Sequence, residues 1–99
     1  MTLPLTFRPE VQKEIDSAYT WYEQRRIGLG DEFMDVLRDH LESIQQNPEL
    51  YAKLYRSVRA SLLQRFPYVV YFRVESDQIR VIGIQHGRQN PRRWRSRAQ

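Results

Sequence analysis

The chain has 99 residues, a net charge of +4 and no cysteine. A chain of this length has room for one modest hydrophobic core, so we expect residues 1–99 to form a single domain. The lack of cysteine excludes disulfides and thiolate metal sites, and no segment has the roughly 20 apolar residues that a membrane-spanning helix needs.

The N-terminal residues do not resemble a signal peptide, because they have neither a basic start nor a long apolar run. We therefore expect a cytoplasmic protein that has no contact with a membrane.

The charge is divided unevenly along the chain. Residues 1–50 carry five Lys/Arg and ten Asp/Glu, a net charge of −5, whereas residues 51–99 carry eleven Lys/Arg and two Asp/Glu, a net charge of +9. Ten of those eleven cations are arginine, whose planar guanidinium suits phosphates and carboxylates. This asymmetry favours a polyanion or an acidic protein segment as partner, while the alternative is a solvated surface that only maintains solubility.

A short strand is expected at the N-terminus, where Leu3, Leu5 and Phe7 alternate with polar residues and proline. Pro4 has no backbone N–H to donate, which predicts that this strand lies at an edge of a sheet.

Two amphipathic helices follow, one from Pro9 to about Arg26 and one from about Asp31 to Asn47. Their apolar stripes have helical spacing: Val11, Ile15, Ala18 and Tyr22 in the first, and Phe33, Leu37, Leu41 and Ile44 in the second. Glycines end the first helix, and Asp31 is the expected cap of the second. The short connection predicts an antiparallel hairpin. His40, beside the second stripe, is expected to be solvated.

The remaining elements are strands. Residues 54–65 are expected to form a strand pair or one bent strand, and 68–74 and 79–84 form a hairpin around the polar turn 75–78. Segregated helices and sequential strands predict an α+β fold, with an N-terminal strand and an antiparallel two-helix hairpin packed on one face of a mostly antiparallel sheet of about four strands. Residues 89–99 are expected to form a basic C-terminal tail.

Seven residues are candidates for binding a nucleic acid or another target. Arg73 and Arg80 alternate with apolar residues and are expected on the solvated face of the sheet, which a partner would cover. Trp94 would either stack on a partner or fold back to seal the edge of the core. The full set is Arg59, Arg73, Arg80, Arg92, Arg93, Trp94 and Arg95.

Two short motifs stand out in the C-terminal half: Arg65-Phe66-Pro67-Tyr68 before the hairpin and Ile84-Gln85-His86-Gly87-Arg88 at its exit. With the order of elements over about residues 3–94, they resemble the RelE/ParE superfamily of bacterial type II toxin–antitoxin toxins, particularly the ParE-like plasmid stabilisation branch. The resemblance implies a growth-inhibiting toxin neutralised by a cognate antitoxin, whose acidic segment would lie over the basic face of the sheet.

The family divides by target. RelE-like members resemble ribosome-dependent mRNA endonucleases, and ParE-like members resemble poisons of DNA gyrase. Metal-independent RNA cleavage without a cofactor would use Arg65 and Arg88 to stabilise phosphate charge and His86 for acid–base chemistry.

Many RelE-like nucleases carry a C-terminal tyrosine, but this chain has no tyrosine after Tyr71, and Lys53 is its one lysine near the start of the sheet. We therefore favour gyrase binding without chemistry over mRNA cleavage. A non-toxic basic domain that binds nucleic acid is the third alternative.

Overall fold

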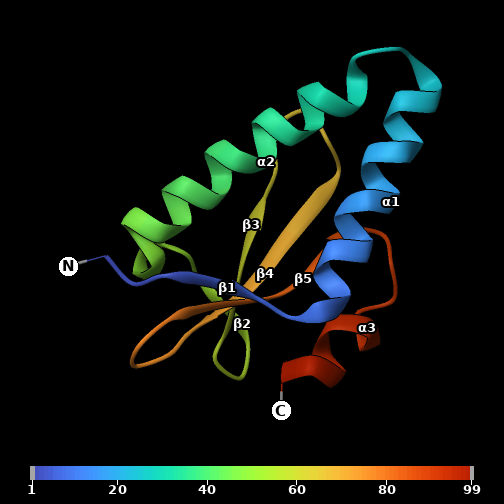
Figure 1. Ribbon diagram of the computed structural model, residues 1–99. Coiled ribbons are helices and arrows are strands. Elements are labelled where there is room, and N and C mark those ends of the chain that lie inside the picture. The colour runs from blue at the N-terminus through green and yellow to red at the C-terminus, as the bar shows by residue number, and fades with distance from the viewer. Residues whose placement is uncertain (1, 99) are drawn as a thin grey trace.

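The computed structural model describes residues 2–98 as a helical hairpin, a five-stranded sheet and a short C-terminal helical segment (Figure 1). The elements in chain order are β1 (Leu5–Phe7), α1 (Pro9–Arg25), α2 (Leu29–Gln46), the 3₁₀ helix η1 (Pro48–Leu50), β2 (Lys53–Tyr55), β3 (Val58–Leu62), β4 (Tyr68–Val74), β5 (Ile79–His86), α3 (Arg92–Arg95) and the 3₁₀ helix η2 (Ser96–Ala98).

The sheet has the strand order β1-β5-β4-β3-β2. β1 pairs in parallel with β5 and the other neighbours are antiparallel, so the predicted α+β class and the edge position of the first strand are confirmed. There are five strands rather than about four, because a turn divides residues 53–62 into β2 and β3. Arg56 lies in this turn with a φ of 53°, a conformation that no strand residue adopts.

The turn between α1 and α2 depends on a carboxylate from the first helix. Glu23 accepts hydrogen bonds from the backbone N–H groups of Gly28 and Gly30, at 2.9 and 3.0 Å. Gly28 has a φ of 91°, and α2 begins directly after it. The prediction that Asp31 caps the second helix is therefore wrong: the helix begins two residues earlier, and Glu23 supplies the acceptor oxygens. From this turn the two helices diverge over one face of the sheet (Figure 1).

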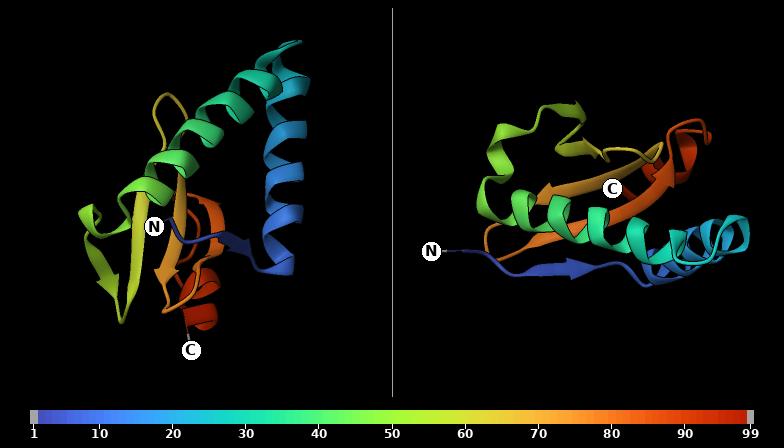
Figure 2. Two further views of the ribbon diagram at one scale, coloured as in Figure 1. Left: turned by 60° about the vertical axis from the view of Figure 1, so that its left-hand side comes forward. Right: turned by 90° about the horizontal axis from the view of Figure 1, so that it is seen from above.

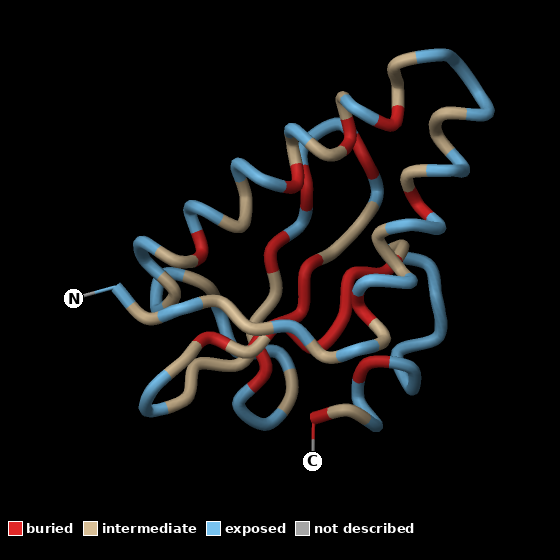
Figure 3. The backbone as a smooth tube through the Cα atoms, viewed as in Figure 1, coloured by how far each residue is buried: buried red, intermediate tan, exposed pale blue. Residues whose placement is uncertain are grey.

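The main core lies between the helical hairpin and the sheet. Four aromatic rings meet there, with centroids 4.8–5.4 Å apart for the pairs Tyr22–Phe66, Tyr22–Phe33, Phe33–Phe66 and Phe33–Tyr68. Buried residues concentrate on the central strands and on the inner sides of the helices (Figure 3). Burial of these rings stabilises the end of the sheet where β4 begins and β5 ends.

A second, smaller core occupies the opposite face of the sheet, where α3 and η2 pack (Figure 2). The Trp94 ring stacks on Tyr71 with centroids 4.4 Å apart and an interplanar angle of 14°. The predicted basic C-terminal segment thus contains α3 and η2, and the solvated sheet face expected from the sequence is partly covered by them. Trp94 and Ala98 are apolar enough to bury themselves on Val58, Tyr71 and Ile82, and the chain covers part of that face itself.

Candidate functional site

An ion pair between the two ends of the chain sets the position of the C-terminal segment. Arg97 contacts Glu14 of α1 at 3.1 Å and donates a 2.9 Å hydrogen bond to the carbonyl of Ile82. Glu14 also accepts from the N–H of Ile84 and from Nε2 of Gln85, at 3.0 and 2.7 Å. This network stabilises the part of β5 beyond its pairing with β1, and it holds the arginines of α3 against one end of the sheet.

The three residues predicted for RNA cleavage lie at the same end of the molecule. The backbone N–H of Gly87 donates to the carbonyl of Pro67 at 2.8 Å, so the loop before β4 lies beside the exit of β5. Arg65 belongs to that loop, and His86 and Arg88 belong to the exit. Within residues 2–98, no hydrogen bond or ion pair joins the side chains of Arg65, His86 and Arg88 to one another.

Each of these side chains has a different environment. Arg65 forms a 2.8 Å ion pair with Glu32, which also contacts Arg26 at 2.9 Å. The hydrogen bonds from the two guanidinium groups lower the pKa of Glu32 below its ordinary value, and the one from Arg65 has the larger effect. The Nδ1 atom of His86 accepts a 3.0 Å hydrogen bond from the backbone N–H of Arg88, and its ring meets Tyr68 edge to face at 5.5 Å.

The predicted binding arginines of the strands lie on opposite faces of the sheet. Arg59 extends toward η1, where it donates to the carbonyl of Tyr51 at 2.6 Å. Arg73 lies on the other face, paired with Glu75 at 2.9 Å and hydrogen-bonded to the carbonyl of Ala98 at 2.9 Å. Arg80 is the register partner of Arg73. Arg59 and Arg73 thus hold neighbouring backbone as well as offering charge, and the structure does not bring them together.

The arginines of α3 are the accessible members of the predicted set. Arg92, Arg93 and Arg95 are exposed and, in the part of the chain that the structure describes, form no ion pair. The Arg95 guanidinium lies 5.0 Å from the ring centroid of Tyr55. Trp94 is 5% exposed, which matches the second of its two predicted positions, sealing the core.

His40 has a structural role that the sequence did not indicate. Its Nδ1 atom lies 3.0 Å from the hydroxyl of Ser61, and its Nε2 atom accepts a 3.3 Å hydrogen bond from the N–H of Gln64. The expectation of a solvated side chain is wrong, because His40 bridges α2 to β3 and the following loop. The sequence signal that could have indicated this contact was Ser61. Alternation along the strand places this polar residue on the sheet face that the helices cover, where it needs a hydrogen-bond partner.

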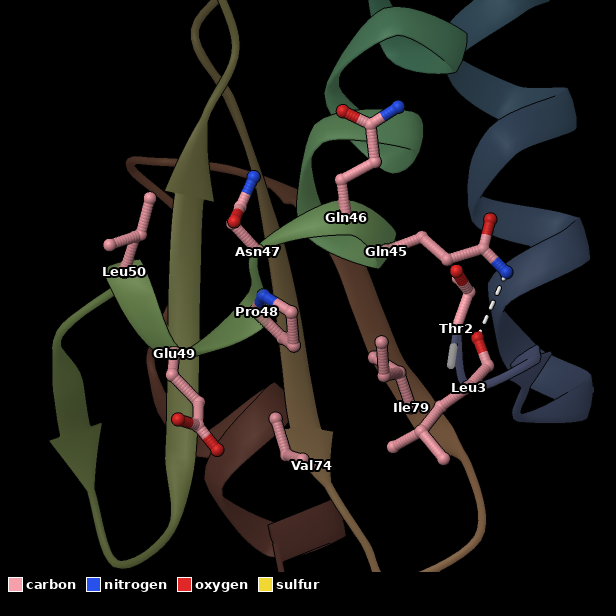
Figure 4. Close-up of a pocket in the computed structure, with 10 residues that line it drawn as sticks. All are labelled: Thr2, Leu3, Gln45, Gln46, Asn47, Pro48, Glu49, Leu50, Val74 and Ile79. Atoms are coloured by element: carbon pink, nitrogen blue, oxygen red, sulfur yellow. Dashed lines mark hydrogen bonds between the residues drawn. The ribbon is translucent and has the colours of Figure 1, made fainter.

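A cavity of about 720 Å³ lies between the C-terminal end of α2, η1 and the end of the sheet where β4 and β5 are connected (Figure 4). Leu3, Val74 and Ile79 supply apolar surface, and Gln45 donates a 2.9 Å hydrogen bond to the carbonyl of Leu3. Glu49 is the ionisable residue among those that line it. The lining is therefore mixed, with five polar and five apolar residues.

No helix within residues 2–98 combines the length and the apolar composition needed to cross a lipid bilayer. In the same residues, no three His, Asp or Glu side chains come together in a way that could hold a metal ion.

Comparison with known proteins identifies the family. A family model described as "ParE toxin of type II toxin-antitoxin system, parDE" matches residues 5–91. Toxin ParE2 of Mycobacterium tuberculosis, from strains CDC 1551 / Oshkosh and ATCC 25618 / H37Rv, is 26% identical over 92 residues, which cover 92% of this chain and 88% of each relative. A solved structure of the chromosomal ParDE TA system from P. aeruginosa has the same fold, with a TM-score of 0.76 and 19% identity over 85% of this chain and 95% of that chain. The resemblance inferred from the sequence is thereby confirmed, and the chain belongs to the ParE toxin family of type II toxin–antitoxin systems.

Proposed function

We propose that this protein inhibits bacterial growth by binding DNA gyrase, without chemistry of its own, and that a cognate antitoxin neutralises it. Membership of the ParE toxin family is the observation that carries the proposal. Gyrase as the target rests on the resemblance of the His86-Gly87-Arg88 exit and the basic C-terminus to ParE-like toxins.

The surroundings of the candidate catalytic groups support binding rather than cleavage. The Arg65 guanidinium is paired with Glu32, and the Nδ1 lone pair of His86 is occupied by the N–H of Arg88. A phosphoryl-transfer site needs cations and a proton carrier that converge on one position. The Arg65 guanidinium would have to leave Glu32 before it could contact a phosphate.

One observation favours mRNA cleavage as the second candidate. Arg65, His86 and Arg88 meet at one end of the sheet because Gly87 is hydrogen-bonded to Pro67. In this alternative, a bound phosphate would replace Glu32 as the partner of Arg65.

The antitoxin surface follows from the basic residues that the chain leaves uncovered. Since α3 and η2 occupy part of the second sheet face, an acidic antitoxin segment would cross Arg80 and the exposed arginines of α3 rather than lie over the whole face. Opposite charges would speed this association more than they would increase its final affinity.

Inducible expression in a bacterial host tests the target, with DNA and protein synthesis followed separately by pulse labelling. If gyrase is bound, DNA synthesis stops first, His86→Ala remains toxic and Arg92→Glu/Arg95→Glu loses toxicity. Arg25→Glu/Arg38→Glu is the matched control, because it reverses two exposed arginines of the helical hairpin, one in α1 and one in α2.

Earlier loss of protein synthesis, with new mRNA 5′ ends that disappear in His86→Ala, would instead establish the nuclease. Normal growth on induction would show a non-toxic domain. Coexpression of the adjacent antitoxin reading frame should restore growth, and failure to do so would contradict neutralisation.

A further inference from the structure

A small cavity lies between α1, the central strands and the start of the C-terminal segment, with a volume of about 220 Å³. Liquid water occupies about 30 Å³ per molecule, so there is room for one phosphate group with accompanying water. Four different parts of the chain line it: α1, β4, β5 and residues 89–93. The lining residues are Lys13, Glu14, Ser17, Tyr68, Ile84, Gln89 and Arg93.

The two cations of this cavity are unpaired in the described structure. Among residues 2–98, neither Lys13 nor Arg93 forms an ion pair, and both are exposed. Glu14, the acidic residue in the lining, is already bound by Arg97, Gln85 and the N–H of Ile84. Its charge is compensated by Arg97, so the positive charges of Lys13 and Arg93 remain for a ligand.

The neutral part of the lining supplies further hydrogen-bond donors. Ser17 is four residues after Lys13 and lies on the same side of α1. Desolvation raises the pKa of Tyr68, so its hydroxyl stays protonated and able to donate at physiological pH. The Gln89 side chain adds an amide N–H₂ group.

We propose that this cavity binds a phosphate group of a nucleic-acid backbone, with Lys13 and Arg93 as the charged contacts and Ser17, Tyr68 and Gln89 as hydrogen-bond donors. The two charged oxygens of a phosphodiester can accept from all of these groups, and a nucleic-acid backbone repeats this anion at a regular spacing, which suits a cavity with further exposed arginines beside it. Arg88 and Arg92 are exposed, and each directly precedes a residue that lines the cavity. We expect them to contact neighbouring phosphates. The inference concerns binding to the nucleic acid itself and holds whichever cellular target is correct.

The test is fluorescence anisotropy of the purified full-length chain with a labelled DNA duplex over a range of salt concentrations. Lys13→Gln/Arg93→Gln should weaken binding by at least about tenfold at low salt and reduce the salt slope by about one, because the two side chains share one phosphate and each lost phosphate contact contributes about 0.9. Lys53→Gln/Arg38→Gln removes the same charges from β2 and α2, outside the cavity, and should leave the slope unchanged. All four substituted residues are exposed, and circular dichroism would check that the variants are folded.

The neutral donors give an independent test. Ser17→Ala, which changes no charge, should weaken DNA binding by several fold and leave the salt slope unchanged. Equal losses in both double variants would overturn the proposal, because they would indicate general charge attraction.

A second arm measures side-chain NMR shifts of Gln89 with inorganic phosphate. A response to inorganic phosphate without DNA binding would also overturn the proposal, since the source would then be a free anion. Binding of an acidic peptide but not of DNA would assign the cavity to a protein partner and contradict it.

Discussion

Glu14 in α1 and Arg97 in η2 form a 3.1 Å ion pair that joins the first helix to the end of the chain, with side chains only 18% and 16% exposed. Because Glu14 also accepts two hydrogen bonds from β5, its loss would leave buried donors without a partner. Glu14→Ala should lower the free energy of unfolding by about 3 kcal/mol, measured by chemical denaturation. Glu10→Ala is the control, since Glu10 is 43% exposed and its ion pairs are solvated. A similar loss in both variants would show that the pair has no special role.

We expect truncation of the two tryptophans to change the free energy of unfolding by very different amounts. Trp94 is 5% exposed and stacked on Tyr71, whereas Trp21 is 53% exposed with the Arg25 guanidinium 3.9 Å from its ring centroid. Trp94→Ala should therefore cost about 3–5 kcal/mol of unfolding free energy, because it empties the second core. Trp21→Ala should cost less than about 1 kcal/mol. Equilibrium unfolding of both variants checks this, and an equal effect would contradict the packing of α3 on the sheet.

Position 30 requires glycine because the Tyr19 ring lies too close for a Cβ atom, and not because of the backbone angles of Gly30. A Cβ atom there would lie 2.8 Å from Cε2 of Tyr19, a ring atom of α1. Gly30→Ala should lower the melting temperature even though alanine favours helices by about 1 kcal/mol. Gly87→Ala is the matched control, because its nearest neighbour would be the Pro67 carbonyl at an ordinary 3.7 Å. An increase in melting temperature for Gly30→Ala would show that the α1–α2 turn is more open.

The turn between β4 and β5 predicts a dependence of stability on pH. The hydrogen bond from Arg73, followed by that from Gln78, holds the pKa of Glu75 below the ordinary value of 4.5. A carboxyl whose pKa is lowered on folding stabilises the native state above pH 4.5, and this contribution is lost as the pH falls through its folded value. Below pH 4.5, the melting temperature should fall less steeply for Glu75→Gln than for the unsubstituted protein. Asp77→Asn, in the same turn, should keep the original slope, and parallel curves for all three proteins would refute the role of Glu75.

The local patterns of the sequence were sufficient for most of the secondary structure. The stripes of α1 and α2, the end of α2 at Asn47 and the β4–β5 hairpin follow from residues three or four apart or from alternation along a strand. The helix hairpin and the order β5-β4-β3-β2 then follow from short connections, whereas the parallel pairing of β1 with β5 does not. The family followed from the order of the elements together with the His86-Gly87-Arg88 exit.

Contacts between distant residues decided what the sequence left open. Glu23 caps α2 instead of Asp31 because the turn carries its carboxylate to two glycine N–H groups. Trp94 is buried because folding brings Tyr71 to it, and Lys13 faces the same cavity as Arg93 because Arg97 is bound to Glu14. A single sequence shows the periodicity of each element, since periodicity depends on neighbours along the chain. It does not show which side chains meet across the sheet, since that depends on how the faces pack.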